Sequence, residues 1–266
     1  MPEALCRIWP SWRHALITVV CAAAMPAGAS LYATDASAQA NRSARALYER
    51  GEFAEAMEAF KRELAKGSPN SSLLYNLGNA CFKAGRLGEA ILYYERAARL
   101  APRDEDIQDN LALARLAAVD RFIEPPRPWP VEVFVRLHRR VTANEVAVLA
   151  AGLWWAVGLA VAARCAAVAR RRQRAAAIAA LVAGILLLPA GLSLAVKLYN
   201  AAYVEQAIVV VEEAELRTGP GASFGSVVTL HEGAKLTIQE RRGVWVHGRM
   251  QTGGEGWVQS GHIETI

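Results

Sequence analysis

Cysteine is scarce in this chain of 266 residues, and the four that occur are widely separated. Cys6 and Cys21 lie near the N-terminus, while Cys81 and Cys165 are each alone in their segments. A disulfide framework or a zinc site needs several cysteine or histidine residues at regular spacing. We therefore expect neither, and we expect Cys81 to be a small buried residue inside a helix.

The motifs of the common enzyme classes are also missing. The sequence holds no phosphate-binding P-loop, no G-x-S-x-G nucleophile elbow and no HExxH metal motif. Three C-terminal histidines, His231, His247 and His262, do not have the spacing of metal ligands. We therefore expect a protein that is not an enzyme and that uses no cofactor and no metal.

Charged residues make up only 21% of the chain, whereas hydrophobic residues make up 53%. This balance argues against a purely soluble enzyme domain. Residues 121–200 carry a net charge of +8 and the remainder sums to −3, so the positive charge surrounds the most apolar segments. That distribution indicates membrane topology and excludes a nucleic-acid patch.

Residues 1–38 have the order of a secretory signal peptide. Arg7 and Arg13 precede the apolar run 15–24, and small residues follow as far as Ala36–Ala38. Cleavage after residues 27–29, or retention as an uncleaved anchor, are the alternatives. Export of the following domain is the interpretation that we favour.

Residues 39–120 contain an internal repeat with a period of 34 residues, typical of stacked helical hairpins. Glycine recurs at 51 and 85, where a hairpin reverses, and prolines follow the second helices. Matching positions hold apolar residues of similar character: Phe53 and Leu87, Ala56 and Ala90, Phe60 and Tyr94, Leu77 and Leu111. This pattern resembles the tetratricopeptide repeat family, and residues 104–119 are then a capping helix.

The resemblance implies an all-α solenoid that binds a peptide or protein on its concave face. The family register places five polar residues on that face: Arg42, Arg45, Asn76, Asn79 and Lys83. The alternative interpretation is that they form a solvated helix face without a partner.

The middle of the chain predicts a two-helix transmembrane hairpin. Residues 121–141 form a proline-rich linker and a juxtamembrane segment, for which a short interfacial helix is one interpretation. Spans are predicted at 142–163 and 175–198, because each holds an uncharged run long enough to cross a bilayer. Five arginines in the intervening segment 164–174 place it in the cytoplasm, and therefore place both flanking domains outside.

Residues 205–266 predict a small all-β domain. Short β-branched runs occur at 208–211, 227–230, 236–238, 244–246 and 256–258, separated by turn signals. The run ELRTGPG at 215–221 and the GWV at 256–258 resemble bacterial SH3 domains. That resemblance implies an SH3-like barrel that binds cell-wall glycopeptide or protein, with Phe224, Trp245 and Trp257 as the candidate ligand surface. Core filling is the favoured alternative for both tryptophans.

The order of these segments resembles the BatE-like proteins of the Bacteroides aerotolerance operon. The resemblance implies a multidomain, multi-pass protein of the cytoplasmic membrane whose repeats and SH3 domain face the periplasm. It also implies a scaffold in envelope stress, beside von Willebrand factor A membrane proteins and a MoxR-type ATPase. A protein that binds or senses peptidoglycan is the alternative.

Overall fold

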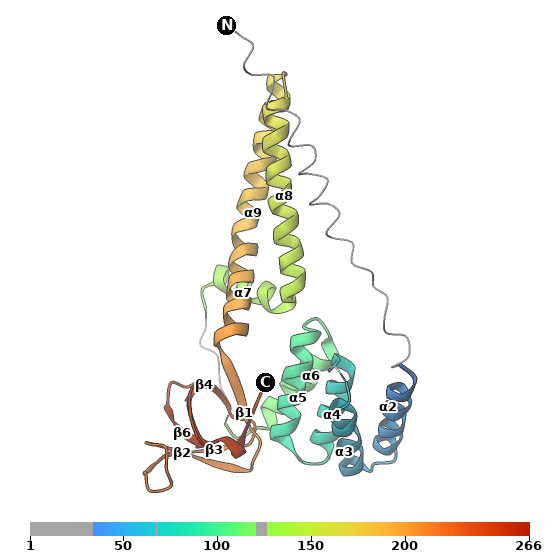
Figure 1. Cartoon of the computed structure of the whole chain (residues 1–266), viewed down its shortest axis with the longest axis vertical. Helices are drawn as coiled ribbons and strands as arrows, with labels where there is room; N and C mark the ends of the chain where they lie inside the picture. Colours follow the sequence, from blue (N-terminus) through green and yellow to red (C-terminus); the bar gives the residue numbers. More distant parts are fainter. Residues whose placement is uncertain (1–33, 68, 121–126) are drawn as a thin grey trace, which may run out of the picture. The chain divides into compact units, whose positions relative to one another are not determined.

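The computed structural model describes residues 34–67, 69–120 and 127–266, with side chains from residue 41 onward (Figure 1). The signal-peptide prediction lies outside these residues, except for 34–38 at the start of the first helix. Residues 40–266 form one compact unit, and the account below concerns that unit.

Consecutive helices build the repeat region, as the 34-residue period predicts. They are α2 (Thr34–Glu49), α3 (Phe53–Leu64), α4 (Ser71–Lys83), α5 (Leu87–Leu100) and α6 (Glu105–Ala117). Gly51 and Gly85 sit in the tight turns after α2 and α4 with φ of 80° and 78°, a left-handed conformation that glycine adopts without strain. Phe60 and Tyr94 are both buried, as are the small residues Ala56 and Ala90.

Two helix starts in this region are fixed by side-chain caps. The Asn70 side chain accepts a hydrogen bond from the Leu73 amide at 2.8 Å, and the Asp104 side chain accepts one from the Ile107 amide at 3.3 Å. Asp104 is therefore the cap of α6 and lies just before its first residue.

The segment after the repeats forms α7 (Trp129–Arg140), α8 (Ala143–Ala166) and α9 (Arg170–Tyr203). Four prolines lie within residues 125–130, a composition that predicts an extended spacer and no helix there. This expectation is wrong at its end, because α7 begins at Trp129 and Pro130 lies in its first turn, where a missing N–H costs nothing. Thr142 and Glu145 have the S/T-x-x-E spacing that predicts a capping box, and they form that box at the start of α8. Four of the five arginines in segment 164–174 belong to the first turns of α9, and the connection between α8 and α9 is only residues 167–169.

Both α8 and α9 are long and apolar enough to cross a membrane, judged by length and composition. They pack against each other, and large apolar side chains such as Trp154, Leu159, Ile185 and Leu188 remain exposed along them.

The C-terminal residues form a seven-stranded antiparallel sheet in the order β3-β2-β6-β5-β4-β1-β7. The strands are β1 (Glu205–Val209), β2 (Glu213–Arg217), β3 (Ser226–His231), β4 (Lys235–Arg242), β5 (Trp245–Met250), β6 (Glu255–Gln259) and β7 (Ile263–Thr265), with a 3-10 turn at Ser260–His262. The predicted closed barrel is wrong, because β3 and β7 form the two edges of the sheet and do not pair with each other. β2 and β7 were not among the predicted strands.

The sheet packs against the repeats through β1 and α5. Ile208 of β1 belongs to the buried core of the repeat helices, and Ile266 packs at its margin. The sheet also has a separate core, which includes Leu216, Leu236 and Val258. The repeats and the sheet are therefore joined by a shared apolar contact.

Candidate functional site

The five predicted partner-binding residues lie on two helices. Asn76, Asn79 and Lys83 fall on one side of α4, because they are spaced by three and four residues. Arg42 and Arg45 are exposed on α2. Among the described residues, no hydrogen bond or ion pair joins these arginines to the α4 group, so the structure gathers only the α4 residues.

A hydrogen-bonded network that the sequence did not predict surrounds Asn79. The Tyr94 hydroxyl donates to Asn79 Oδ1 at 2.6 Å, and Asn110 Nδ2 donates to the same oxygen at 3.1 Å. Asn110 Nδ2 also donates to the Tyr75 hydroxyl at 2.9 Å. The network ties α4 to α5 and α6. The 34-residue period contained a signal for it, since Asn110 is the equivalent of Asn76 in the next repeat.

The protonation of Tyr94 favours this arrangement. Burial raises the pKa of Tyr94 above its usual value, so the hydroxyl stays neutral and remains a donor to Asn79. The carbonyl oxygen of Asn79 is then fully used. Among the described residues its amide group donates no hydrogen bond, and it is available to an acceptor such as a peptide carbonyl or carboxylate.

A buried charge cluster joins the sheet to α5. Glu95, which is 8% exposed, receives hydrogen bonds from Arg115 at 2.5 Å and from Lys235 of β4 at 3.1 Å. Burial alone raises the pKa of Glu95, but the two cations outweigh it and hold that pKa below its ordinary value. Glu95 is therefore an ionised carboxylate that links the sheet to the repeats.

Further contacts extend this junction along α5. The Gly88 amide donates to the Glu232 carboxylate at 3.0 Å, and Arg96 pairs with Glu264 at 2.9 Å. Arg96 also donates to the Thr265 carbonyl oxygen. The sheet therefore covers this side of α5, whereas Asn76, Asn79 and Lys83 lie on α4.

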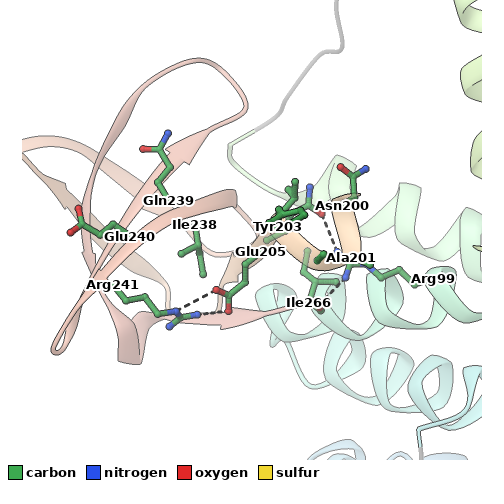
Figure 2. Close-up of a pocket in the computed structure, with 13 residues that line it drawn as sticks. Arg99, Asn200, Ala201, Tyr203, Glu205, Ile238, Gln239, Glu240, Arg241 and Ile266 are labelled. Carbon is green, nitrogen blue, oxygen red and sulfur yellow. Dashed lines mark hydrogen bonds and ion pairs between the residues drawn. The ribbon is translucent and has the colours of Figure 1, made fainter. Parts of the chain in front are cut away.

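An open pocket of about 640 Å³ lies where α9 ends beside β1, β4 and Arg99 (Figure 2). Its cationic groups are already engaged. Arg99 donates to the Ile266 carbonyl oxygen at 2.9 Å, and Arg241 pairs with Glu205 at 2.5 Å. Both arginines are therefore held by hydrogen bonds to residues of the sheet, and we assign the pocket a structural role where α9 meets the sheet.

The three predicted aromatic residues of the C-terminal domain differ in exposure. Phe224 is 46% exposed in the loop before β3, Trp245 is half-buried, and Trp257 is buried. Cross-strand register pairs Val246 with Val258 in the sheet core, so Trp245 and Trp257 lie on the opposite side of their strands. Trp257 is buried, as core filling predicts, but it lies outside the apolar cluster of the sheet, whereas Trp245 is only half-buried and does not fit that expectation.

Trp257 is instead covered by polar side chains. The His247 ring lies 5.0 Å from the Trp257 ring, and the Arg242 guanidinium lies 5.2 Å from it in a cation–π contact. Arg217, paired with Trp257 across β2 and β6, donates to the Phe224 carbonyl oxygen at 2.8 Å. This side of the sheet therefore gathers aromatic rings and cations around Trp257.

The lone cysteine of the repeats has no reactive environment. Cys81 is fully buried in α4, and burial raises the pKa of its thiol to about 12. Across the part of the chain that the structure describes, no group of three His, Cys, Asp or Glu residues is placed to hold a metal ion.

Comparison with known proteins identifies one segment. Residues 41–105 match a family described as tetratricopeptide repeat, the segment that forms α2 to α5. Among curated proteins, none matches the chain. The chain therefore contains tetratricopeptide repeats, which indicate a scaffold for protein–protein interaction.

Proposed function

We propose that the protein is a non-enzymatic, membrane-anchored scaffold whose repeats hold a protein partner. The observation that carries this proposal is the α4 surface formed by Asn76, Asn79 and Lys83, in which the Asn79 amide group donates no hydrogen bond within the described residues. The sheet covers a different surface of the repeat module, on α5. An amide and an ammonium group at this spacing suit the backbone and carboxylate groups of a peptide.

A membrane location is supported by the exposed apolar surfaces of α8 and α9. The predicted signal peptide and the arginines at the start of α9 favour a cytoplasmic position for the tip of this hairpin. Alkaline phosphatase fused after Val119 or Ile266 is then expected to be active, and a fusion at Arg171 inactive. If only the Arg171 fusion were active, the hairpin tip would lie outside the cytoplasm and the proposed topology would be wrong.

The resemblance to BatE-like proteins suggests the setting of the scaffold. In this proposal its partners are von Willebrand factor A membrane proteins and the associated MoxR-type ATPase system, in an aerotolerance or envelope-stress complex. Neighbouring genes that encode such proteins would support this setting.

The repeat site is tested by co-purification of the full chain with a von Willebrand factor A membrane protein encoded beside it. Asn76→Ala with Lys83→Ala removes two polar groups for which the structure shows no internal hydrogen bond, whereas Asn79→Ala would also break the Tyr94 bond. The double variant is expected to insert normally and to lose the partner. Glu55→Ala with Arg62→Ala, both exposed on α3, is the matched control.

Cell-wall binding is a second candidate, favoured by the aromatic and cationic groups around Trp257. Aromatic rings beside polar groups suit sugar and peptide ligands. Full-length protein is expected to bind purified peptidoglycan, and Trp245→Ala to weaken that binding, while the Asn76/Lys83 variant binds normally. Equal retention of the wild type on a column without peptidoglycan would exclude this function.

A further inference from the structure

Helix α7 has an uncovered apolar stripe. Trp129, Val133 and Leu137 recur every four residues and are 78%, 49% and 62% exposed. Residues at this spacing share one side of a helix. No residue of α7 is buried, so the stripe faces outward over more than two turns.

The other side of α7 is held against α9. His138 Nδ1 lies 2.8 Å from the Ser193 hydroxyl, and Phe134 stacks on the His138 ring at 5.9 Å. Ser193 and Ala190 of α9 are both buried. These two residues belong to the predicted span 175–198, so α7 is attached beside the end of an apolar helix. Its Glu132 and Arg136 also line a shallow pocket with Pro102 and Gln108 of the repeat region.

Cationic residues border the stripe. Arg136 and Arg140 are exposed and lie one position before and three positions after Leu137. Glu132 is the only acid of α7 and pairs with Arg136 at 3.6 Å, so the helix keeps a net charge of +2. The capping box at Thr142 then begins α8 within two residues of Arg140.

We propose that α7 lies in the surface of the bilayer, with Trp129, Val133 and Leu137 among the acyl chains and its arginines on anionic lipid headgroups. This inference rests on the proposed membrane anchoring. An interfacial helix combines an apolar stripe, a tryptophan and flanking cations in this way. The attachment to α9 beside Ser193 holds the stripe at the margin of the span.

The proposal also explains the positive residues on the outer side of the membrane. The arginines at the start of α9 predict a cytoplasmic hairpin tip, which leaves Arg136, Arg139 and Arg140 outside. Headgroup phosphates of anionic lipids attract positive residues at this position. A protein partner would not require the stripe to lie beside the start of the first span.

Spin labels on the full chain in lipid nanodiscs test this placement. Cys6, Cys21 and Cys165 are replaced by serine, and labels are attached at Leu137→Cys, at Glu132→Cys on the polar side of α7, and at Leu186→Cys in α9. Collision rates with oxygen, which enters lipid, and with a water-soluble nickel chelate report the surroundings of each label.

The label at 137 is expected to collide with oxygen and to be shielded from nickel, and the label at 132 to show the reverse. Replacing phosphatidylglycerol by phosphatidylcholine, or Arg136 and Arg140 by glutamine, is expected to increase nickel access at 137. Each arginine that is replaced is expected to lower the partitioning of α7 into the anionic bilayer surface about fivefold.

The outcomes separate this proposal from the anchoring on which it rests. Nickel access at 186 would refute the anchoring itself. Shielding at 186 with free nickel access at 137 would refute the interfacial helix alone. Shielding of 137 from both reagents would show that protein covers the stripe and would also overturn the proposal.

Discussion

At Gly88 the backbone of α5 lies very close to the backbone of the sheet. A Cβ at this position would lie 2.5 Å from the Val209 carbonyl oxygen and 3.1 Å from the Val210 Cα. Carbon atoms in contact prefer about 3.5 to 4.0 Å, so Gly88→Ala forces the sheet away by roughly 1 Å. Both obstructing atoms belong to the backbone and cannot move by a rotamer change.

Two effects of Gly88→Ala lower the free energy of unfolding and one raises it. Overpacking costs about 1 to 3 kcal/mol, and weakening the bond from the Gly88 amide to Glu232 costs about 1.5 to 3 kcal/mol. Alanine favours the helix by about 1 kcal/mol over glycine. We therefore expect a net destabilisation of about 2 kcal/mol or more, although the same change would stabilise an isolated helix.

Hydrogen exchange of the full chain in detergent measures the effect locally. Two repeats and a cap are a short solenoid that depends on its neighbours, so a loosened sheet is expected to speed exchange in α5 and α6. A loss of about 2 kcal/mol corresponds to roughly 30-fold faster exchange. Gly67→Ala, where an added Cβ meets nothing within 4 Å, is the control. Unchanged or slower exchange in α5 after Gly88→Ala would refute the packing argument.

Three further predictions concern single contacts. Gly78→Ala places a Cβ 2.7 Å from the Tyr94 ring and is expected to lower stability by about 1 to 3 kcal/mol in thermal unfolding; an unchanged midpoint would mean that the ring moves without cost. The depressed pKa of Glu95 contributes stability that is present above its ordinary pKa of 4.5 and is lost as the pH falls below that value. Urea unfolding at decreasing pH is therefore expected to show a loss that Glu95→Gln reduces, whereas an equal loss in that variant would assign the effect to other groups. Thr142→Val removes the cap of α8 and is expected to cost about 1 kcal/mol, seen as faster amide exchange in its first turn; protection equal to the wild type would show that the cap is dispensable.

Local signals in the sequence predicted the helical half of this fold well. The 34-residue period predicted the helix pairs, and the glycines at 51 and 85 predicted their turns, because a left-handed backbone is a property of the residue itself. The capping box of Thr142 and Glu145 was predicted for the same reason, since its partners are three residues apart. Apolar runs likewise predicted α8 and α9, although α9 begins at Arg170, before the predicted span 175–198.

The pairing of the strands and the proposed binding surface depended on residues far apart in the chain. The sequence by itself determined the repeats, the apolar helices and most of the strands, because these follow from short-range spacing and composition. Only the tertiary structure decided that the sheet stays open, that it covers α5, and that Asn79 lies in a network with Tyr94 and Asn110. Glu95 and Lys235 are 140 residues apart, and neither has a local pattern that identifies the other. Their pairing exists because two separate surfaces fit closely enough to exclude water, and complementarity of that kind arises only when the chain has folded.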